Sequence, residues 1–179
     1  MSFFKSKADR ARDVGIKTAI EISEYSSNAT FALLASAERA AGTFSKSPTV
    51  ERDVLSTLCG ILAHVVLRMD ESRLGPAEID SMRDSLRFSL AMAIAEVLHG
   101  VHGDESARAA SAATAQERLD LIASRLSEIQ APRDLLSAGA VLVAEEVLPA
   151  DVDSEVKDQF GTPCLSAIAS GLQRIRPTG

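Results

Sequence analysis

The stretch with the clearest chemical potential is Glu96-Val-Leu-His99-Gly-Val-His102. Residues three apart occupy neighbouring positions on one helix face, so Glu96 and His99 would point the same way. A Glu-x-x-His pair is also a recurring part of the ligand set in di-iron carboxylate bundles. Glu96, His99 and His102, together with His64, are therefore the candidate metal ligands.

The rest of a metal site is missing from the sequence. A di-iron bundle needs a second Glu-x-x-His and two further Glu, and a catalytic zinc needs three protein ligands. The chain has three His and a single Glu-x-x-His, and Gly100 is typical of a helix end that would separate His102 from the pair. We expect no bound metal and no cofactor. In the alternative interpretation, His99 or His102 hydrogen-bonds the last carbonyls of its helix.

His64 is the other candidate because it lies at the edge of a strongly apolar helix. It could face Glu96 or His99 and line a small polar pocket, or it could be a core histidine with one partner. No base is paired with a Ser or Cys in a recognisable motif, so we assign no catalytic residue and favour a noncatalytic protein. The cysteines, Cys59 and Cys164, lack metal or redox spacing and are predicted to lie in the core.

The elements that would position these residues are helices. Residues 47–69 are apolar almost all round the helical wheel, which is typical of a central helix. Gly75-Pro76, with Leu74 and Ile79 around them, predict the start of the next helix. We therefore expect an antiparallel hairpin of about 48–72 and 76–100 at the centre of the fold.

Other helices must cover this hairpin. The first runs from about 6 to 41, and its polar stretch Ser23 to Asn28 predicts a bend or a division into two helices. Further helices are expected over 104–130 and 132–148, although a strand at 140–143 is conceivable. An acidic turn or short helix at 151–160 would precede a last helix capped by Thr162-Pro163. The prediction is an all-α, single domain over 1–179 with six to seven helices, a mobile arm at 1–8 and a loose tail at 176–179.

Composition narrows the classes of partner. The net charge of −6 argues against nucleic-acid binding, which requires a basic surface. Charge is uneven, because residues 1–20 are basic whereas residues 145–158 are acidic. The sequence has no apolar run long enough to cross a membrane and no leader-like start, so we expect a cytoplasmic protein. Phe3 and Phe4 beside lysines could contact a membrane surface or a partner, or pack on the domain itself.

A narrow apolar seam on residues 104–130 could pair with another chain. Its members are Leu119, Ile122, Leu126 and Ile129. We expect the first helix to cover this seam, with a homodimer contact as the alternative.

Two candidate functions follow from the sequence. The first is a noncatalytic helical interaction protein, an adaptor, regulator or assembly component, that binds a protein partner or itself through helix faces and charged termini. The alternative is a small-ligand- or metal-binding bundle with a pocket near His64, Glu96 and His99.

Overall fold

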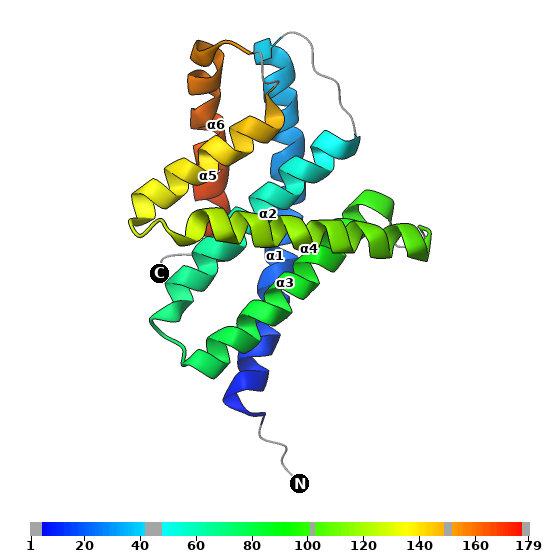
Figure 1. The fold of residues 1–179 in the computed structure, drawn as a ribbon, viewed down its shortest axis with the longest axis vertical. Coiled ribbons are helices and arrows are strands. Elements are labelled where there is room, and N and C mark those ends of the chain that lie inside the picture. The colour runs from blue at the N-terminus through cyan, green and yellow to red at the C-terminus, as the bar shows by residue number, and fades with distance from the viewer. Residues whose placement is uncertain (1–4, 42–47, 101–102, 149–151, 177–179) are drawn as a thin grey trace.

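The computed structural model describes residues 5–41, 48–100, 103–148 and 152–176, and every regular element in these ranges is an α-helix (Figure 1). The described helices are α1 (Lys7–Ala41), α2 (Pro48–Glu71), α3 (Pro76–His99), α4 (Glu105–Ser127), α5 (Pro132–Val147) and α6 (Ser154–Ile175). The predicted all-α class is confirmed. The strand considered at 140–143 is wrong, because this stretch lies inside α5.

The helix ends follow local signals in the sequence. Gly75 is the N-cap of α3, and its backbone N–H donates to the Glu78 carboxylate at 2.8 Å. Proline follows Gly75 as the first helical residue, a position whose N–H would have no intrahelical partner. α3 ends before Gly100, whose φ of 69° is a conformation that glycine adopts without a Cβ clash. Asp104 caps α4 by accepting a first-turn backbone N–H at 3.0 Å.

α2 occupies the central position that its apolar wheel predicts. It contacts each of the other described helices and crosses the middle of the molecule (Figure 1). Its buried apolar residues are Val54, Leu55, Leu58, Cys59, Ile61, Leu62, Ala63, Val65, Val66 and Leu67. α3 runs back from α2 after a short connection, but it packs more extensively against α1 than against α2. The centre of the fold therefore includes α1 as well as the α2 and α3 pair.

Gly60 in α2 marks a close approach between helices. A Cβ atom at Gly60 would lie 3.1 Å from the Ile122 side chain of α4. This separation is tighter than ordinary van der Waals contact, so the glycine lets α4 pack closely on α2. The atoms nearest to this position belong to a side chain of α4.

α1 is continuous through the polar stretch Ser23 to Asn28, so the predicted alternative of two helices is wrong. The Ser23 hydroxyl and the Asn28 amide donate to carbonyl oxygens one turn earlier, at 3.0 and 2.9 Å. Their polar groups are thus satisfied inside the helix. Tyr25 lies between them, and its hydroxyl donates to the Ala167 carbonyl of α6 at 2.6 Å. Packing against α6 therefore stabilises a part of α1 whose own residues have a low preference for helix.

α1 and α3 run side by side in the same direction, and small residues make their contact (Figure 1). A Cβ atom at Gly15 of α1 would lie 2.6 Å from the Met82 carbonyl oxygen and would overlap the Ser85 hydroxyl. The Ser81 hydroxyl of α3 donates to the Ala8 carbonyl at 3.0 Å. The small buried residues spaced by one turn on this face of α1 are Ala11, Gly15 and Ala19. Their size lets the two backbones approach closely.

α6 continues through Pro163, so the expected start of a separate last helix at Thr162-Pro163 is wrong. The helix begins earlier, where the Asp153 carboxylate accepts the Glu155 backbone N–H at 3.0 Å. Proline removes one helical hydrogen bond and usually kinks or ends a helix. Here Phe160 and Cys164 are both buried, one on each side of Pro163. Core packing on these two side chains offsets the local cost of the proline.

Both ends of the described chain make specific contacts with the rest of the fold. Ser6, within the segment expected to be mobile, caps α1 because its hydroxyl accepts the Asp9 N–H at 3.0 Å. Arg176, where a loose tail was expected, pairs its Nη2 with Oδ2 of the buried Asp70 at 2.9 Å. Residues 1–4, among them Phe3 and Phe4, and residues 177–179 lie outside the described residues. None of the described helices combines the length and the apolar character that crossing a membrane requires.

Candidate functional site

The structure separates the residues of the Glu96 and His99 group from His64. Glu96 and His99 are exposed at the end of α3, whereas His64 lies in the middle of α2. The His99 Nε2 atom is 2.6 Å from the Ser111 hydroxyl of α4. His102 lies outside the described residues. Within the described ranges, no group of three or more His, Cys, Asp or Glu side chains is placed to hold a metal ion.

The apolar seam of α4 is covered by the chain itself. Leu119, Ile122 and Leu126 are buried, and Ile129 packs at the edge of the same core. The helices that contact α4 are α2, α3 and α5. The expectation that the first helix covers the seam is wrong, because α1 packs on the other side of α3. These side chains offer no free apolar surface in this fold.

The two cysteines lie in the core, as the sequence predicts. Cys59 and Cys164 are buried and free. Burial raises the pKa of each thiol to about 12. For Cys59, the nearby Ser26 hydroxyl opposes the effect of burial on the pKa only in part. Because the thiolate is the reactive form, neither side chain is a nucleophile at neutral pH.

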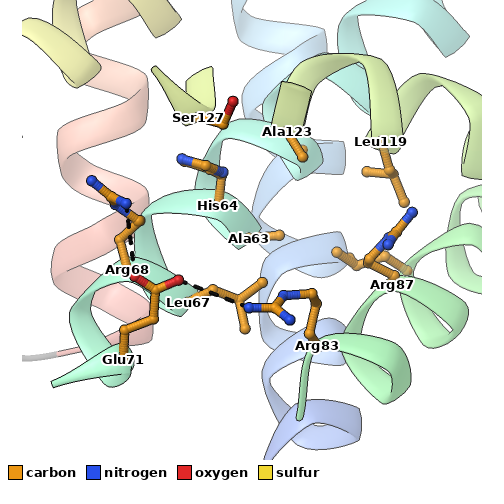
Figure 2. A pocket seen from close by; sticks show the side chains of 12 residues that line it. Ala63, His64, Leu67, Arg68, Glu71, Arg83, Arg87, Leu119, Ala123 and Ser127 are labelled. Carbon is orange, nitrogen blue, oxygen red and sulfur yellow. Dashed lines mark ion pairs between the residues drawn. The ribbon is translucent and has the colours of Figure 1, made fainter. Parts of the chain in front are cut away.

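His64 lines a pocket between α2, α3 and α4 (Figure 2). The cavity has a volume of about 250 Å³. Its apolar wall consists of Gly60, Ala63, Leu67, Leu90, Leu119 and Ala123, and its polar residues are His64, Arg68, Glu71, Arg83, Arg87 and Ser127. Glu96 and His99 are not in this lining. The predicted pocket beside His64 is present, but its polar residues differ from those expected.

Three arginines dominate the polar side of this pocket, which we call the His64 pocket. The Glu71 carboxylate lies between Arg68 and Arg83, with N···O distances of 3.8 and 3.9 Å (Figure 2). Arg68 also donates to the Gln130 side chain at 3.1 Å, and Arg83 pairs with Asp80 at 2.5 Å. These contacts hold the guanidinium groups at the rim.

Two nitrogen atoms of pocket residues have no partner among the described residues. Arg87 pairs with Asp120 through Nη2, but its buried Nε has no hydrogen-bond acceptor. The Nε2 atom of His64 is also buried and unpartnered. Burial lowers the pKa of His64 below its ordinary value of 6.5, and the Arg68 charge lowers it further, against a smaller opposing effect of Glu71. Unsatisfied buried polar atoms are rare, and the other described residues that carry one include Ser26, Thr30 and Ser56, which lie outside this pocket.

Sequence reasoning missed Arg83 and Arg87 as neighbours of His64. A simple count would have found them. In an antiparallel helix hairpin, residues equally far from the connection lie at the same level. The connection between α2 and α3 is centred near residues 73 and 74, so His64 and Arg83 are equally far from it and lie at the same level. Glu96 is further from the connection than any pocket residue of α2 or α3.

A second feature is an exposed apolar strip on α1 and α3. Ile16 and Phe88 line one shallow groove between these helices. Ile20 and Met92 follow one turn later on the same faces of the two parallel helices. The exposed fractions are 37% for Ile16, 52% for Ile20, 66% for Phe88 and 40% for Met92. We call these four residues the α1/α3 strip. Single exposed apolar residues are common, whereas a group of them is typical of an interaction surface. The groove beside Ile16 and Phe88 is otherwise polar, lined by Arg12, Asp84 and three serines.

No protein-family model, curated protein or solved structure matches this chain. Its function is therefore argued from the two surfaces described above.

Proposed function

We propose that this protein is a noncatalytic helical interaction protein that binds a protein partner through the α1/α3 strip. The observation that carries the proposal is the exposure of Phe88, an aromatic side chain two-thirds open to solvent beside Ile16. Aromatic side chains supply much of the binding energy at interfaces because they bury a large area with few rotatable bonds. An adaptor, regulator or assembly component would use such a face.

The supporting surface is rigid. Gly15 and its small neighbours lock α1 against α3, so the positions of Ile16 and Phe88 relative to each other are fixed. A pre-organised face loses little conformational entropy on binding. An amphipathic helix of the partner would fit the shallow groove between two parallel helices.

Charge favours an acidic partner over a second copy. Residues 5–20 carry Lys5, Lys7, Arg10, Arg12 and Lys17 against Asp9 and Asp13. A two-fold dimer through this face would place the same basic residues opposite each other. An acidic helix would meet them with complementary charge, which also speeds association at low salt.

A photoreactive residue in place of Phe88 tests this proposal in the native cell extract. The expected product is a covalent complex with one acidic protein. The purified partner should then bind the wild-type chain, lose at least tenfold in affinity to Phe88→Glu, and bind more weakly as salt rises. Leu121→Glu is the matched control, because Leu121 of α4 is also exposed, at 48%, but lies outside the strip.

Two outcomes would contradict the proposal. A cross-linked dimer of this chain, with a mass in dilute solution that Phe88→Glu halves, would make the occupant a second copy. Equal binding of the partner by wild type and Phe88→Glu would remove the α1/α3 strip from the interface.

A further inference from the structure

The His64 pocket has the shape and lining of a small-molecule site. Its inner wall is apolar, with Leu67, Leu90 and Leu119 contributed by three different helices. Its volume is about 250 Å³. An apolar cavity of about 150 Å³ can hold benzene, so this pocket can take a body of one aromatic ring with one substituent.

The charges around the pocket favour an anion. Arg68, Arg83 and Arg87 line it, whereas Glu71 is the one carboxylate in the lining. Asp80 and Asp120 pair with Arg83 and Arg87 and are not in the lining. A guanidinium group has five N–H donors, more than one carboxylate accepts. Donors therefore remain for a ligand.

The contacts of the pocket arginines are consistent with N–H donors that remain unused. The Glu71 carboxylate is 3.8 Å from Arg68 and 3.9 Å from Arg83, which is beyond hydrogen-bond distance. The buried Arg87 Nε has no acceptor among the described residues, and the buried His64 Nε2 has no partner there either.

We propose that the His64 pocket binds a small organic monoanion, an apolar body of about one aromatic ring that carries a carboxylate. The ring lies against Leu67, Leu90 and Leu119, and the carboxylate accepts from the arginines at the rim. This site lies among α2, α3 and α4, whereas the α1/α3 strip lies on α1 and α3. The ligand proposal goes beyond the proposed partner binding and can stand or fail without it.

Benzoate is the probe, titrated into the isotope-labelled full chain and followed by amide NMR. We expect saturable binding in the millimolar range or tighter, with the largest shifts at Gly60, Ala63, Leu67 and Leu90. Benzyl alcohol keeps the ring without the charge, and acetate keeps the charge without the ring. Both should bind at least tenfold more weakly than benzoate, because each lacks either the carboxylate or the ring that the pocket is proposed to contact.

Variants locate the site. Ala123→Met should fill the pocket from the partly exposed side of α4 and abolish benzoate binding. Arg87→Met should weaken it at least tenfold. Arg125→Met is the matched control, since it removes the same charge from a surface arginine of α4 that pairs with Glu145 and is not in the pocket lining. If Arg87→Met does not fold, Arg83→Met takes its place.

Each contrary result has a distinct meaning. Equal binding of benzoate and benzyl alcohol would show that the pocket binds the ring and not the carboxylate. That result would overturn the proposal of an anion site. No saturable benzoate binding, or unchanged binding in Ala123→Met, would overturn the site itself. The photocrosslinking result at Phe88 is unaffected in every case, so failure of the two proposals can be told apart.

Discussion

His64 lies in an environment that disfavours its protonated form. It is part-buried in α2, its Nε2 atom has no hydrogen-bond partner among the described residues, and Arg68 lies one turn away. Burial and a neighbouring positive charge both disfavour the protonated imidazole, so the pKa of His64 is lowered. The neutral ring is therefore the form that fits the fold at neutral pH.

This lowered pKa predicts a pH dependence of stability. Between the folded pKa and the ordinary value of 6.5, the unfolded chain binds more protons than the folded one. The free energy of unfolding therefore falls as the pH drops through 6.5 towards the folded pKa, and is unaffected by His64 above that window. His64→Gln lacks this titration.

Urea unfolding of wild type and His64→Gln at about pH 7.5 and about pH 5.5 measures the effect. The wild-type chain should lose more stability over this interval than the variant. Most carboxylates remain ionised there, so they contribute little to the difference. Parallel losses in the two proteins would show that the His64 pKa is not lowered by folding.

At this scale, the features that the sequence predicts well are local. The caps at Gly75 and Asp104 depend on residues within one turn, and both are present. The pocket residues span Gly60 to Ser127 on three helices, so their meeting depends on how the helices pack. Arg83 could be placed level with His64 by a count along the hairpin, but the pocket residues of α4 could not be named without knowing how α4 packs on α2 and α3.

At the scale of helices, the closest packing is between α1 and α3. Gly15→Ala would place a Cβ atom 2.6 Å from the Met82 carbonyl oxygen, so one helix must shift. Overpacking of this kind costs about 1 to 3 kcal/mol, more than the gain of about 1 kcal/mol in helix propensity. We expect Gly15→Ala to lower the free energy of unfolding, by up to about 2 kcal/mol.

Gly161→Ala is the matched control in α6. Among the described residues, nothing lies within 4 Å of a Cβ atom at Gly161, so helix propensity alone should act. This variant should gain about 0.5 to 1 kcal/mol in the free energy of unfolding. Thermal and urea unfolding would measure the expected loss of stability in Gly15→Ala and the expected gain in Gly161→Ala. A stabilised Gly15→Ala protein would mean that α1 and α3 are further apart than described.

Two helices show why sequence reasoning placed some boundaries wrongly. The polar stretch of α1 and Pro163 of α6 are both local signals that favour a break. In the fold, Tyr25 holds α1 to the Ala167 carbonyl, and buried Phe160 and Cys164 hold α6 on either side of the proline. Tertiary packing overrides local preference at both places, and a single sequence gives little indication of it.

For the whole molecule, Tyr25 is a natural reporter of assembly. The chain has one Tyr and no Trp. The Tyr25 hydroxyl donates to α6, and its ring lies against Gly171 of the same helix. α1 also contacts α2, α3 and α5. Tyrosine fluorescence therefore reports the docking of α1 and α6, while far-ultraviolet circular dichroism reports all helices.

We expect the two signals to follow one unfolding transition with the same midpoint, because helices that share a core unfold together. Gly15→Ala should move both midpoints by the same amount. A tyrosine transition at clearly lower urea than the circular dichroism transition would show that α1 and α6 detach separately. That result would also contradict the predicted single domain over 1–179.

The parallel contact between α1 and α3 has a consequence for how the chain assembles. Gly15 and Ser85 are separated by about 70 residues, and all of α2 lies between them. α1 leaves the ribosome first, but the helix against which it packs most extensively is complete only when residue 99 has been added. Closing so long a loop is slow compared with pairing of sequence neighbours such as α2 and α3. During synthesis, the small-residue face of α1 stays without α3 until residue 99 has been added, so the contact between α1 and α3 cannot be complete before the whole α2 and α3 hairpin has been made.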